Sequence, residues 1–334
     1  MRNQIIWILL LALAASLPAH AQLTAEQIVQ RAIDNAGGDA KLAAVRTAEF
    51  MSQMVTPTND TLSISVKKKG NDRCYISVLS FAFENTTTVY NNGHAVLIKN
   101  DTATAITDVD RLEQLALQCY PSIDYAYKKL GYKLTRVEDM KEGNFDCYGI
   151  IAESPLGSRT INYYDKKTGD CIMIVYGSGG RTVFINHIPY HGLNYTRDIL
   201  LSDAEGHISP SFLRDISIDE NPDDNWFSLP PAGAHRPPDV FKTGRFRYVN
   251  GGDTTLHITR DAHKQVEGAK EYHIEWLTPG DYLLSRLKDA SAPVTNDNIE
   301  FIKARITLWS GNRYYCQYLT SGEVVGTAAF ERVE

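Results

Sequence analysis

A serine among glycines is the first group in this chain whose type and spacing could carry out chemistry. Ser178 stands in Tyr176-Gly-Ser-Gly-Gly180. A serine on a G-x-S-x-G turn between a strand and a helix is the nucleophile of many hydrolases. Only the second half of that motif is present, and both flanking segments have the apolar pattern of strands. We therefore predict a glycine-rich hairpin turn at Ser178 and no nucleophile.

Two histidines and a run of acids could bind a metal, but their settings argue against it. His187 and His191 have the four-residue spacing of helical zinc pairs, yet Pro189 lies between them in a strand-like segment. The acids of 219–224 lack the alternating ligands and the terminal Glu of a calcium loop. No phosphate-loop, dinucleotide-binding or H-E-x-x-H motif occurs. We predict no catalytic residue, no metal, no cofactor and hence no enzyme.

Cysteine chemistry is equally unsupported. The five cysteines are Cys74, Cys119, Cys147, Cys171 and Cys316, an odd number that leaves at least one unpaired within the chain. None has the C-x-x-C spacing of redox or zinc motifs. We predict that most are small buried apolar residues.

The composition indicates a globular, β-rich protein. The chain has 334 residues, more than one hydrophobic core usually organises, so two domains are expected. Its 43% apolar and 22% charged residues exclude a disordered chain, a fibre and a coiled coil. A net charge of −6 leaves no basic excess to neutralise phosphates, so nucleic acid is not an expected partner. The 18 tyrosines favour strands.

The N-terminus has the features of an export signal. Met1-Arg2 supplies a positive charge, Ile5 to Ala15 is apolar, and Ala19-His20-Ala21 is a small-residue cleavage site. The alternative, an uncleaved anchor helix, needs roughly 20 apolar residues. We predict a signal peptide over 1–21, no membrane span in the mature chain, and a periplasmic or secreted protein.

Capping residues and apolar spacing predict helices at two places. Thr24-Ala-Glu-Gln27 has the form of a capping box, and Gly37-Gly38 ends the helix that follows it. Asp108 can cap a second helix, and Pro121 can open a third that continues to Leu130.

The other segments have the pattern of short strands. Before residue 221 they cover 61–67, 74–83, 87–90, 95–98, 147–152, 159–164, 171–176, 183–188, 195–200 and 212–218. After residue 238 they cover 241–248, 254–259, 271–276, 281–285, 300–309, 313–318 and 323–331. Strands at this spacing favour a small barrel or sandwich for the second region.

A proline-rich polar segment, 221–238, separates the two strand regions and is the predicted domain boundary. The predicted domains are therefore 22–230 and 241–334, joined by a linker over 231–240.

A curved antiparallel sheet with helices over its open face could enclose an apolar cavity, and such a cavity holds acyl chains without catalytic groups. Alternation selects one face of each strand, and the helices of 108–130 would form a lid. The strand candidates are Leu62, Ile64, Val66, Tyr148, Ile150, Ile161, Tyr163, Met173 and Val175, and the helical ones are Leu112, Leu115 and Ile123. Apolar alternation is the same in a packed core, so both interpretations stay open.

The order of four segments resembles the LolA/LolB-like periplasmic lipoprotein-carrier superfamily, which includes outer-membrane lipoprotein-sorting proteins. The segments are the helix and glycine pair of 28–45, the hairpin Thr88-Val-Tyr-Asn-Asn-Gly-His-Ala-Val96, the hairpin Tyr163-Tyr-Asp-Lys-Lys-Thr-Gly-Asp-Cys-Ile172, and Asp219-Glu-Asn-Pro-Asp-Asp-Asn-Trp-Phe-Ser-Leu-Pro230. The resemblance covers about residues 24 to 230. No position aligns with the lipid-handling arginine of the carriers. The region 241–334 resembles a small β domain of Bacteroidetes proteins through Phe241-Lys-Thr-Gly-Arg-Phe-Arg-Tyr248 and Ile274-Glu-Trp276.

The resemblance implies an unclosed β-barrel with helices on its concave face that holds lipid or lipoprotein acyl chains. The expected fold is thus mainly β (α+β), with this half-barrel followed by a small all-β barrel or sandwich. Two hypotheses for function follow. The first is a non-enzymatic periplasmic carrier of a hydrophobic ligand. The second is a structural or interaction protein of the cell envelope, with a packed core, no ligand and a protein partner.

Overall fold

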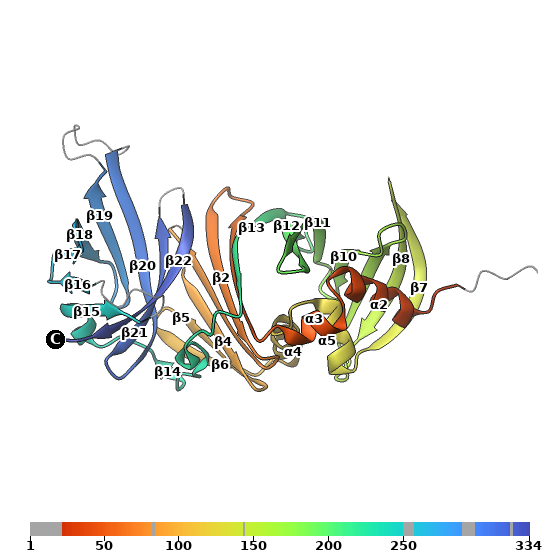
Figure 1. Cartoon of the computed structure of the whole chain (residues 1–334), viewed down its shortest axis with the longest axis horizontal. Helices are drawn as coiled ribbons and strands as arrows, with labels where there is room; N and C mark the ends of the chain where they lie inside the picture. The colour runs from red at the N-terminus through yellow and green to blue at the C-terminus, as the bar shows by residue number, and fades with distance from the viewer. Residues whose placement is uncertain (1–21, 82–83, 143, 250–256, 289–297, 321–322) are drawn as a thin grey trace, which may run out of the picture.

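The computed structural model describes residues 22–81, 84–142, 144–249, 257–288, 298–320 and 323–334. The predicted signal peptide lies outside these residues, as does the start of the predicted strand 254–259. The fold class is confirmed: the described chain is mainly β, with one large antiparallel sheet and one closed barrel. Figure 1 shows the barrel at one end of an elongated molecule and strands β7 and β8 near the other.

The first region is a 14-stranded sheet that does not close. Its strands are β1 (Thr47–Val55), β2 (Thr61–Lys69), β3 (Arg73–Ser80), β4 (Thr86–Asn91), β5 (His94–Lys99), β6 (Thr102–Ile106), β7 (Lys133–Glu142), β8 (Phe145–Glu153), β9 (Arg159–Asp165), β10 (Cys171–Tyr176), β11 (Arg181–Tyr190), β12 (Leu193–Ser202), β13 (Ile208–Ile218) and β14 (Gly233–Ala234). Strands β1 to β6 and β7 to β13 are two meanders of sequential neighbours. Pairing of β1 with β13 joins them, so the first and last long strands meet in the middle.

Four helices lie on the concave face of this sheet (Figure 1). They are α2 (Ala25–Asn35), α3 (Asp39–Ala44), α4 (Val109–Gln118) and α5 (Ile123–Leu130). The predicted capping box of Thr24 and Gln27 is present, and Asp108 caps α4 through the backbone N–H of Arg111 at 2.7 Å. The prediction that Pro121 opens α5 is wrong by two residues, because Ser122 is the N-cap and the helix begins at Ile123.

The helices bury their apolar stripes against the sheet. Ile28, Val29 and Ile33 of α2 are almost fully buried, and they share one core with Leu115 of α4 and Ile150 of β8. Burial of a side chain of this size contributes about 1.5–3 kcal/mol. The helices are therefore held across the open side of the sheet by a continuous hydrophobic core.

The second region is a closed eight-stranded barrel, which settles the alternative of barrel or sandwich. Its strands are β15 (Gly244–Tyr248), β16 (His257–Arg260), β17 (Lys264–Glu267), β18 (Lys270–Trp276), β19 (Asp281–Leu287), β20 (Ile299–Ser310), β21 (Arg313–Thr320) and β22 (Glu323–Arg332). Aromatic rings fill the interior, among them those of Phe246, Tyr282 and Tyr314.

The barrel packs on the convex face of the sheet, over β1 to β5. Trp226, from the 3-10 turn η1 (Asp224–Phe227), is fully buried there between Tyr75 of the sheet and Tyr315 of the barrel, with ring centroids 4.8 Å apart on each side. The segment 221–238, predicted to be the domain boundary, thus contributes to the contact between the two regions.

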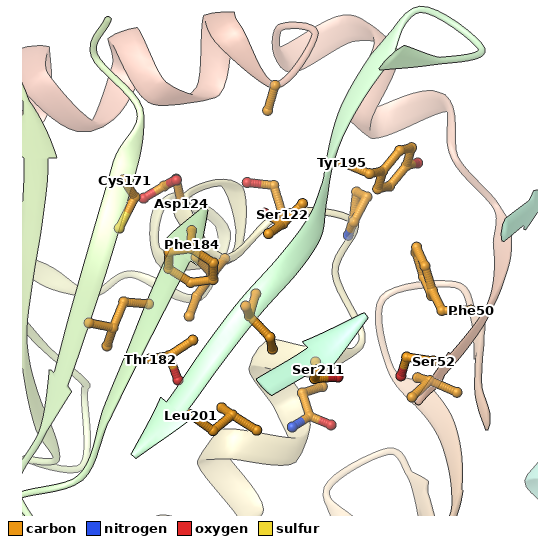
Figure 2. Close-up of a pocket in the computed structure, with 18 of the residues that line it drawn as sticks. Phe50, Ser52, Ser122, Asp124, Cys171, Thr182, Phe184, Tyr195, Leu201 and Ser211 are labelled. Atoms are coloured by element: carbon orange, nitrogen blue, oxygen red, sulfur yellow. The ribbon is translucent and has the colours of Figure 1, made fainter. Parts of the chain in front are cut away.

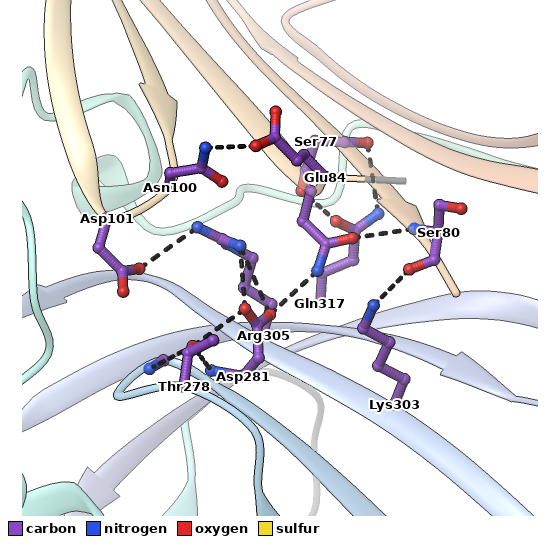
Figure 3. Close-up of polar contacts among 12 residues, drawn as sticks. Ser77, Ser80, Glu84, Asn100, Asp101, Thr278, Asp281, Lys303, Arg305 and Gln317 are labelled. Atoms are coloured by element: carbon purple, nitrogen blue, oxygen red, sulfur yellow. Dashed lines mark hydrogen bonds and ion pairs between the residues drawn. The ribbon is translucent and has the colours of Figure 1, made fainter. Parts of the chain in front are cut away.

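Polar pairs complete this contact (Figure 3). Arg305 of the barrel lies 3.1 Å from Asp281 of the same barrel. It also lies 3.4 Å from Asp101, which belongs to the sheet region. Ser77 of β3 donates to the side-chain oxygen of Gln317, and Lys303 donates to the backbone carbonyl of Ser80, also in β3. Because a buried polar group is costly unless it is hydrogen-bonded, these pairs hold the two regions in one register.

Candidate functional site

A pocket of about 610 Å³ lies between the concave face of the sheet and the helices. This volume is within the range of about 300–1,000 Å³ that is typical of ligand sites. Its apolar lining comes from both meanders and from the helices, and includes Phe50, Ile64, Val66, Ile76, Val78, Ile174, Tyr176, Phe184, Tyr195, Ile199, Leu201, Ala32, Ala36 and Ile123. Figure 2 shows Thr182 and Phe184 on one side of the pocket and Phe50 and Ser52 on the other.

Strand β2 forms one wall because its side chains alternate between two buried environments. Ile64 and Val66 face the pocket and are only partly buried. Ser63, Ser65 and Lys67 point to the convex face and are buried under the barrel. On this strand the apolar set is the more accessible one, which is the reverse of an ordinary half-buried strand.

Strands β11 and β12 form the opposite wall in register. Thr182 pairs with Leu201 and Phe184 pairs with Ile199, and all four side chains line the pocket. Leu200, which pairs with Val183, belongs to the other face. The alternation of the strand thus decides which of two adjacent leucines meets a ligand.

Two cationic side chains, Lys68 and Arg111, line the pocket, and Lys68 is the one on the inner wall of the sheet. Lys68 continues the face of Ile64 and Val66, and its Nζ donates to the backbone carbonyl of Tyr120 at 2.8 Å. Its Nζ also lies 5.1 Å from the ring centroid of Phe50. Burial lowers the pKa of Lys68. Among the described residues, no carboxylate lies within ion-pair distance of this ammonium group.

A buried carboxyl group lies at the start of helix α5. Asp124 is 6% exposed and accepts a hydrogen bond from the hydroxyl of Tyr164 at 2.6 Å. Burial raises the pKa of Asp124 to about 6, although the bond from Tyr164 acts in the opposite direction. This group changes its charge in a mildly acidic medium.

The groups that the sequence singled out for chemistry are dispersed. Ser178 is exposed in the turn between β10 and β11, as predicted. His187 lines the pocket, whereas His191 stands in the turn between β11 and β12 with a φ of 51°. Within the described chain, possible ligand atoms of Asp203, Glu205 and His207 lie within 4.8 Å of one another, but all three residues are exposed in a hairpin.

The five cysteines are buried free thiols. Cys171 lines the pocket, and burial raises the pKa of its thiol well above the ordinary value. A buried thiol with a raised pKa is a poor nucleophile.

The twelve predicted cavity residues divide into three groups. Ile64, Val66 and Ile123 line the pocket. A second group lies outside the lining: Ile150 and Leu115 are fully buried in the core, Tyr148 and Leu112 pack against that core, and Leu62 lies farther along the pocket-facing side of β2.

The third group faces away from the pocket. Residues Ile161, Tyr163, Met173 and Val175 pair with one another across β9 and β10. Their neighbours Ile174 and Tyr176 line the pocket instead. The residues of β10 that face the pocket therefore lie one position along the chain from those that were predicted. Both alternating sets of β10 are apolar, so alternation alone could not choose between its faces.

Several lining residues escaped the sequence reasoning. Lys68 carried a signal, because it extends the alternation of Ile64 and Val66 by one more step. Phe50 lies on β1, and Tyr195 and Phe184 lie on strands whose inward phase depends on bulges and on pairing with distant segments. Such residues become neighbours only when the two meanders join.

Comparison with known proteins gives likenesses at the level of the fold. No family model and no curated protein matches the chain. Among solved structures, a LolA superfamily protein from Nitrosomonas europaea is 13% identical, with a TM-score of 0.46, over 61% of this chain and 98% of that one. An outer membrane lipoprotein-sorting protein domain from Vibrio parahaemolyticus is 11% identical, with a TM-score of 0.44, over 61% of this chain and 95% of that one.

A third likeness extends over both regions. The MucA/MucB complex of Pseudomonas aeruginosa contains a chain that is 10% identical, with a TM-score of 0.24, over 92% of each chain. Two of these solved structures bear the name of the superfamily that the sequence of the first region resembles, and the resemblance of the second region to a Bacteroidetes domain is not confirmed. In the described part of the chain, no helix is long and apolar enough to span a membrane.

Proposed function

We propose that this protein binds a hydrophobic ligand, with the acyl chain of a lipid or lipoprotein in the pocket, and acts as a non-enzymatic carrier or sensor after export to the periplasm. The observation that carries this proposal is the pocket of about 610 Å³ lined mainly by apolar side chains. Transfer of each CH₂ group from water to such a lining contributes about 0.8 kcal/mol, so a long chain binds without any catalytic group.

The rival hypothesis, an envelope protein with a packed core and no ligand, has a weaker physical basis. Well-packed interiors contain few voids larger than a water molecule. Here Ile64, Val66 and Phe184 stay partly accessible on the inner side of the sheet. Apolar side chains that are left accessible inside a fold favour a site that a ligand completes.

The test is a titration with a fluorescent fatty-acid probe, with displacement by unlabelled fatty acid. We expect saturable binding at micromolar concentrations. Leu201→Trp adds bulk to the pocket wall and should weaken binding at least tenfold. Leu200→Trp, on the same strand but on the outer face, is the matched control and should bind as the wild type does.

Two results would count against the proposal. One is the absence of saturable probe binding to the folded wild type. The other is equal loss of binding in both leucine variants, because a site inside the half-barrel has to distinguish the two faces of β12.

A further inference from the structure

Lys68 is a partly buried cation on the inner wall of the half-barrel, and its hydrogen-bond donors are used incompletely. Lys68 has three N–H donors, and within the described residues one of them bonds, to the carbonyl of Tyr120. The side of the ammonium group next to Phe50 makes only a ring contact. Two donors are left at the wall of a pocket that is mostly apolar but is also lined by Arg111, Asp124 and Asp170.

Among the described residues, no carboxylate is an ion-pair partner of Lys68. The titratable groups that favour its charged form are the thiols of Cys119 and Cys74, which are weak acids. An ammonium group that is withdrawn from water without a counter-ion is costly, and the usual remedies are loss of the proton or arrival of an anion. Burial indeed lowers the pKa of Lys68, in the direction expected for a cation that lacks its anion.

The hydroxyl group of Ser122 is a second polar group at the pocket, near the carbonyl that Lys68 contacts. Ser122 follows Tyr120 by two residues, is the N-cap of α5 and lines the pocket, but its side chain makes no capping hydrogen bond. Figure 2 shows it among the residues around the pocket. Lys68 donates to the carbonyl of Tyr120, two residues before Ser122, and both residues line the pocket. Their ammonium group and hydroxyl can therefore hold an anionic head group while the chain attached to it lies along the apolar walls.

We propose that Lys68, assisted by Ser122, binds the anionic head group of a single-chain amphiphile, a carboxylate or a phosphate. This inference rests on the proposed function and specifies its ligand class. The only other role that the contacts of Lys68 support is structural, since Tyr120 follows the C-terminal end of α4, where a cation is also favourable. A purely structural lysine would affect stability but not the choice between charged and neutral ligands.

The experiment compares three ligands with the same sixteen-carbon chain: palmitate, hexadecyl phosphate and hexadecanol. Each displaces the fluorescent probe from the wild type at pH 7. We expect both anions to bind about tenfold or more tightly than the alcohol, as for hydrogen bonds to a charged group. The anion that binds more tightly identifies the head-group chemistry.

Variants then locate the selectivity. Lys68→Met should bring the three affinities within about threefold, and Lys68→Arg should keep the preference for anions. Lys69→Met is the matched control: the next residue of β2 points to the opposite face and pairs with Asp224 at 2.9 Å, so its loss should leave the three affinities unchanged.

The outcomes separate this inference from the proposed function. Equal binding of the anions and the alcohol to the wild type would overturn the head-group site and leave the acyl pocket standing. A folded Lys68→Met protein that still prefers anions would do the same. No binding of any of the three ligands would overturn both. The wild-type comparison alone decides the matter if a variant does not fold.

Discussion

The interiors of the half-barrel and of the closed barrel use a buried cation in opposite ways. In the closed barrel Arg260 is 2% exposed and donates to Gln265, to the carbonyl of Phe241 and to the hydroxyls of Tyr282 and Tyr314, at 2.8 to 3.2 Å. In the half-barrel, Lys68 has one such partner. The first cation is satisfied by its own fold, whereas the second still has donors to offer.

This difference follows from closure of the sheet. A closed eight-stranded barrel has an interior just wide enough for side chains to fill it, and here aromatic rings, aliphatic side chains and the guanidinium of Arg260 fill it. An open sheet covered by helices leaves unfilled space wherever the helices do not reach. Function is therefore expected in the half-barrel, and stability is expected to depend more strongly on the interior of the closed barrel.

The largest expected effect is at Arg260. Arg260→Met should destabilise the protein by about 3–5 kcal/mol, because it leaves buried oxygen atoms of Gln265, Phe241 and two tyrosines without donors. Lys68→Met should change stability by about 1 kcal/mol or less, because it frees a single carbonyl. Urea denaturation followed by intrinsic fluorescence measures both. Similar losses for the two variants would abolish the contrast between the interiors.

The next effect is the pH dependence that Asp124 gives to the half-barrel. The pKa of Asp124 is raised from its ordinary value of 3.8 to about 6. The folded state therefore binds this proton more tightly than the unfolded state, and the group's contribution to stability is lost as the pH rises from about 4 through 6. Between pH 4 and pH 7 the loss is about 2 kcal/mol.

Asp124→Asn should remove that part of the pH dependence and make the protein more stable than the wild type at pH 7. The measurement is the free energy of unfolding of both proteins at several values of pH between 4 and 7. Parallel stability curves for the two proteins would contradict the assignment of a raised pKa to Asp124.

The smallest effect concerns the boundary between the two regions. We propose that it lies within 221–238, and the exposed residues 231–232, just before β14, are the expected site of cleavage by a protease of broad specificity. Because Trp226 and the polar pairs around Arg305 join the regions, the two fragments should stay together on size-exclusion chromatography and separate only in denaturant. Fragments that separate at once, or a chain that resists cleavage there, would contradict this prediction.

Much of the fold could be predicted from local patterns, and the failures have physical causes. The caps at Thr24 and Asp108 and the hairpin at Asn91-Asn92-Gly93 are confirmed, since each depends on residues that are close in sequence. Strand β7 was missed because its charged side chains interrupt the alternation. It is the edge of the sheet, where charges are tolerated and prevent unwanted pairing.

The candidate site was predictable only in part. Alternation on β2 placed Ile64 and Val66 correctly, because Ser63 and Ser65 marked the other face. On β10 all residues from Cys171 to Tyr176 are apolar, and a bulge near Met173 shifts the pairing with β9. The inward face there depends on that bulge, and no local pattern in the sequence reveals it.

The sequence by itself determined the mainly β class, the helix caps and the division into two strand regions, because these follow from short-range periodicity and turn chemistry. Only the tertiary structure decided which face of each strand turns inward, since the joining of β1 to β13 and the docking of the barrel bury the polar face of β2 and leave its apolar face open. The same packing decided the surroundings of Lys68. Its hydrogen-bond partner, the carbonyl of Tyr120, lies 52 residues away along the chain, and no carboxylate among the described residues pairs with it.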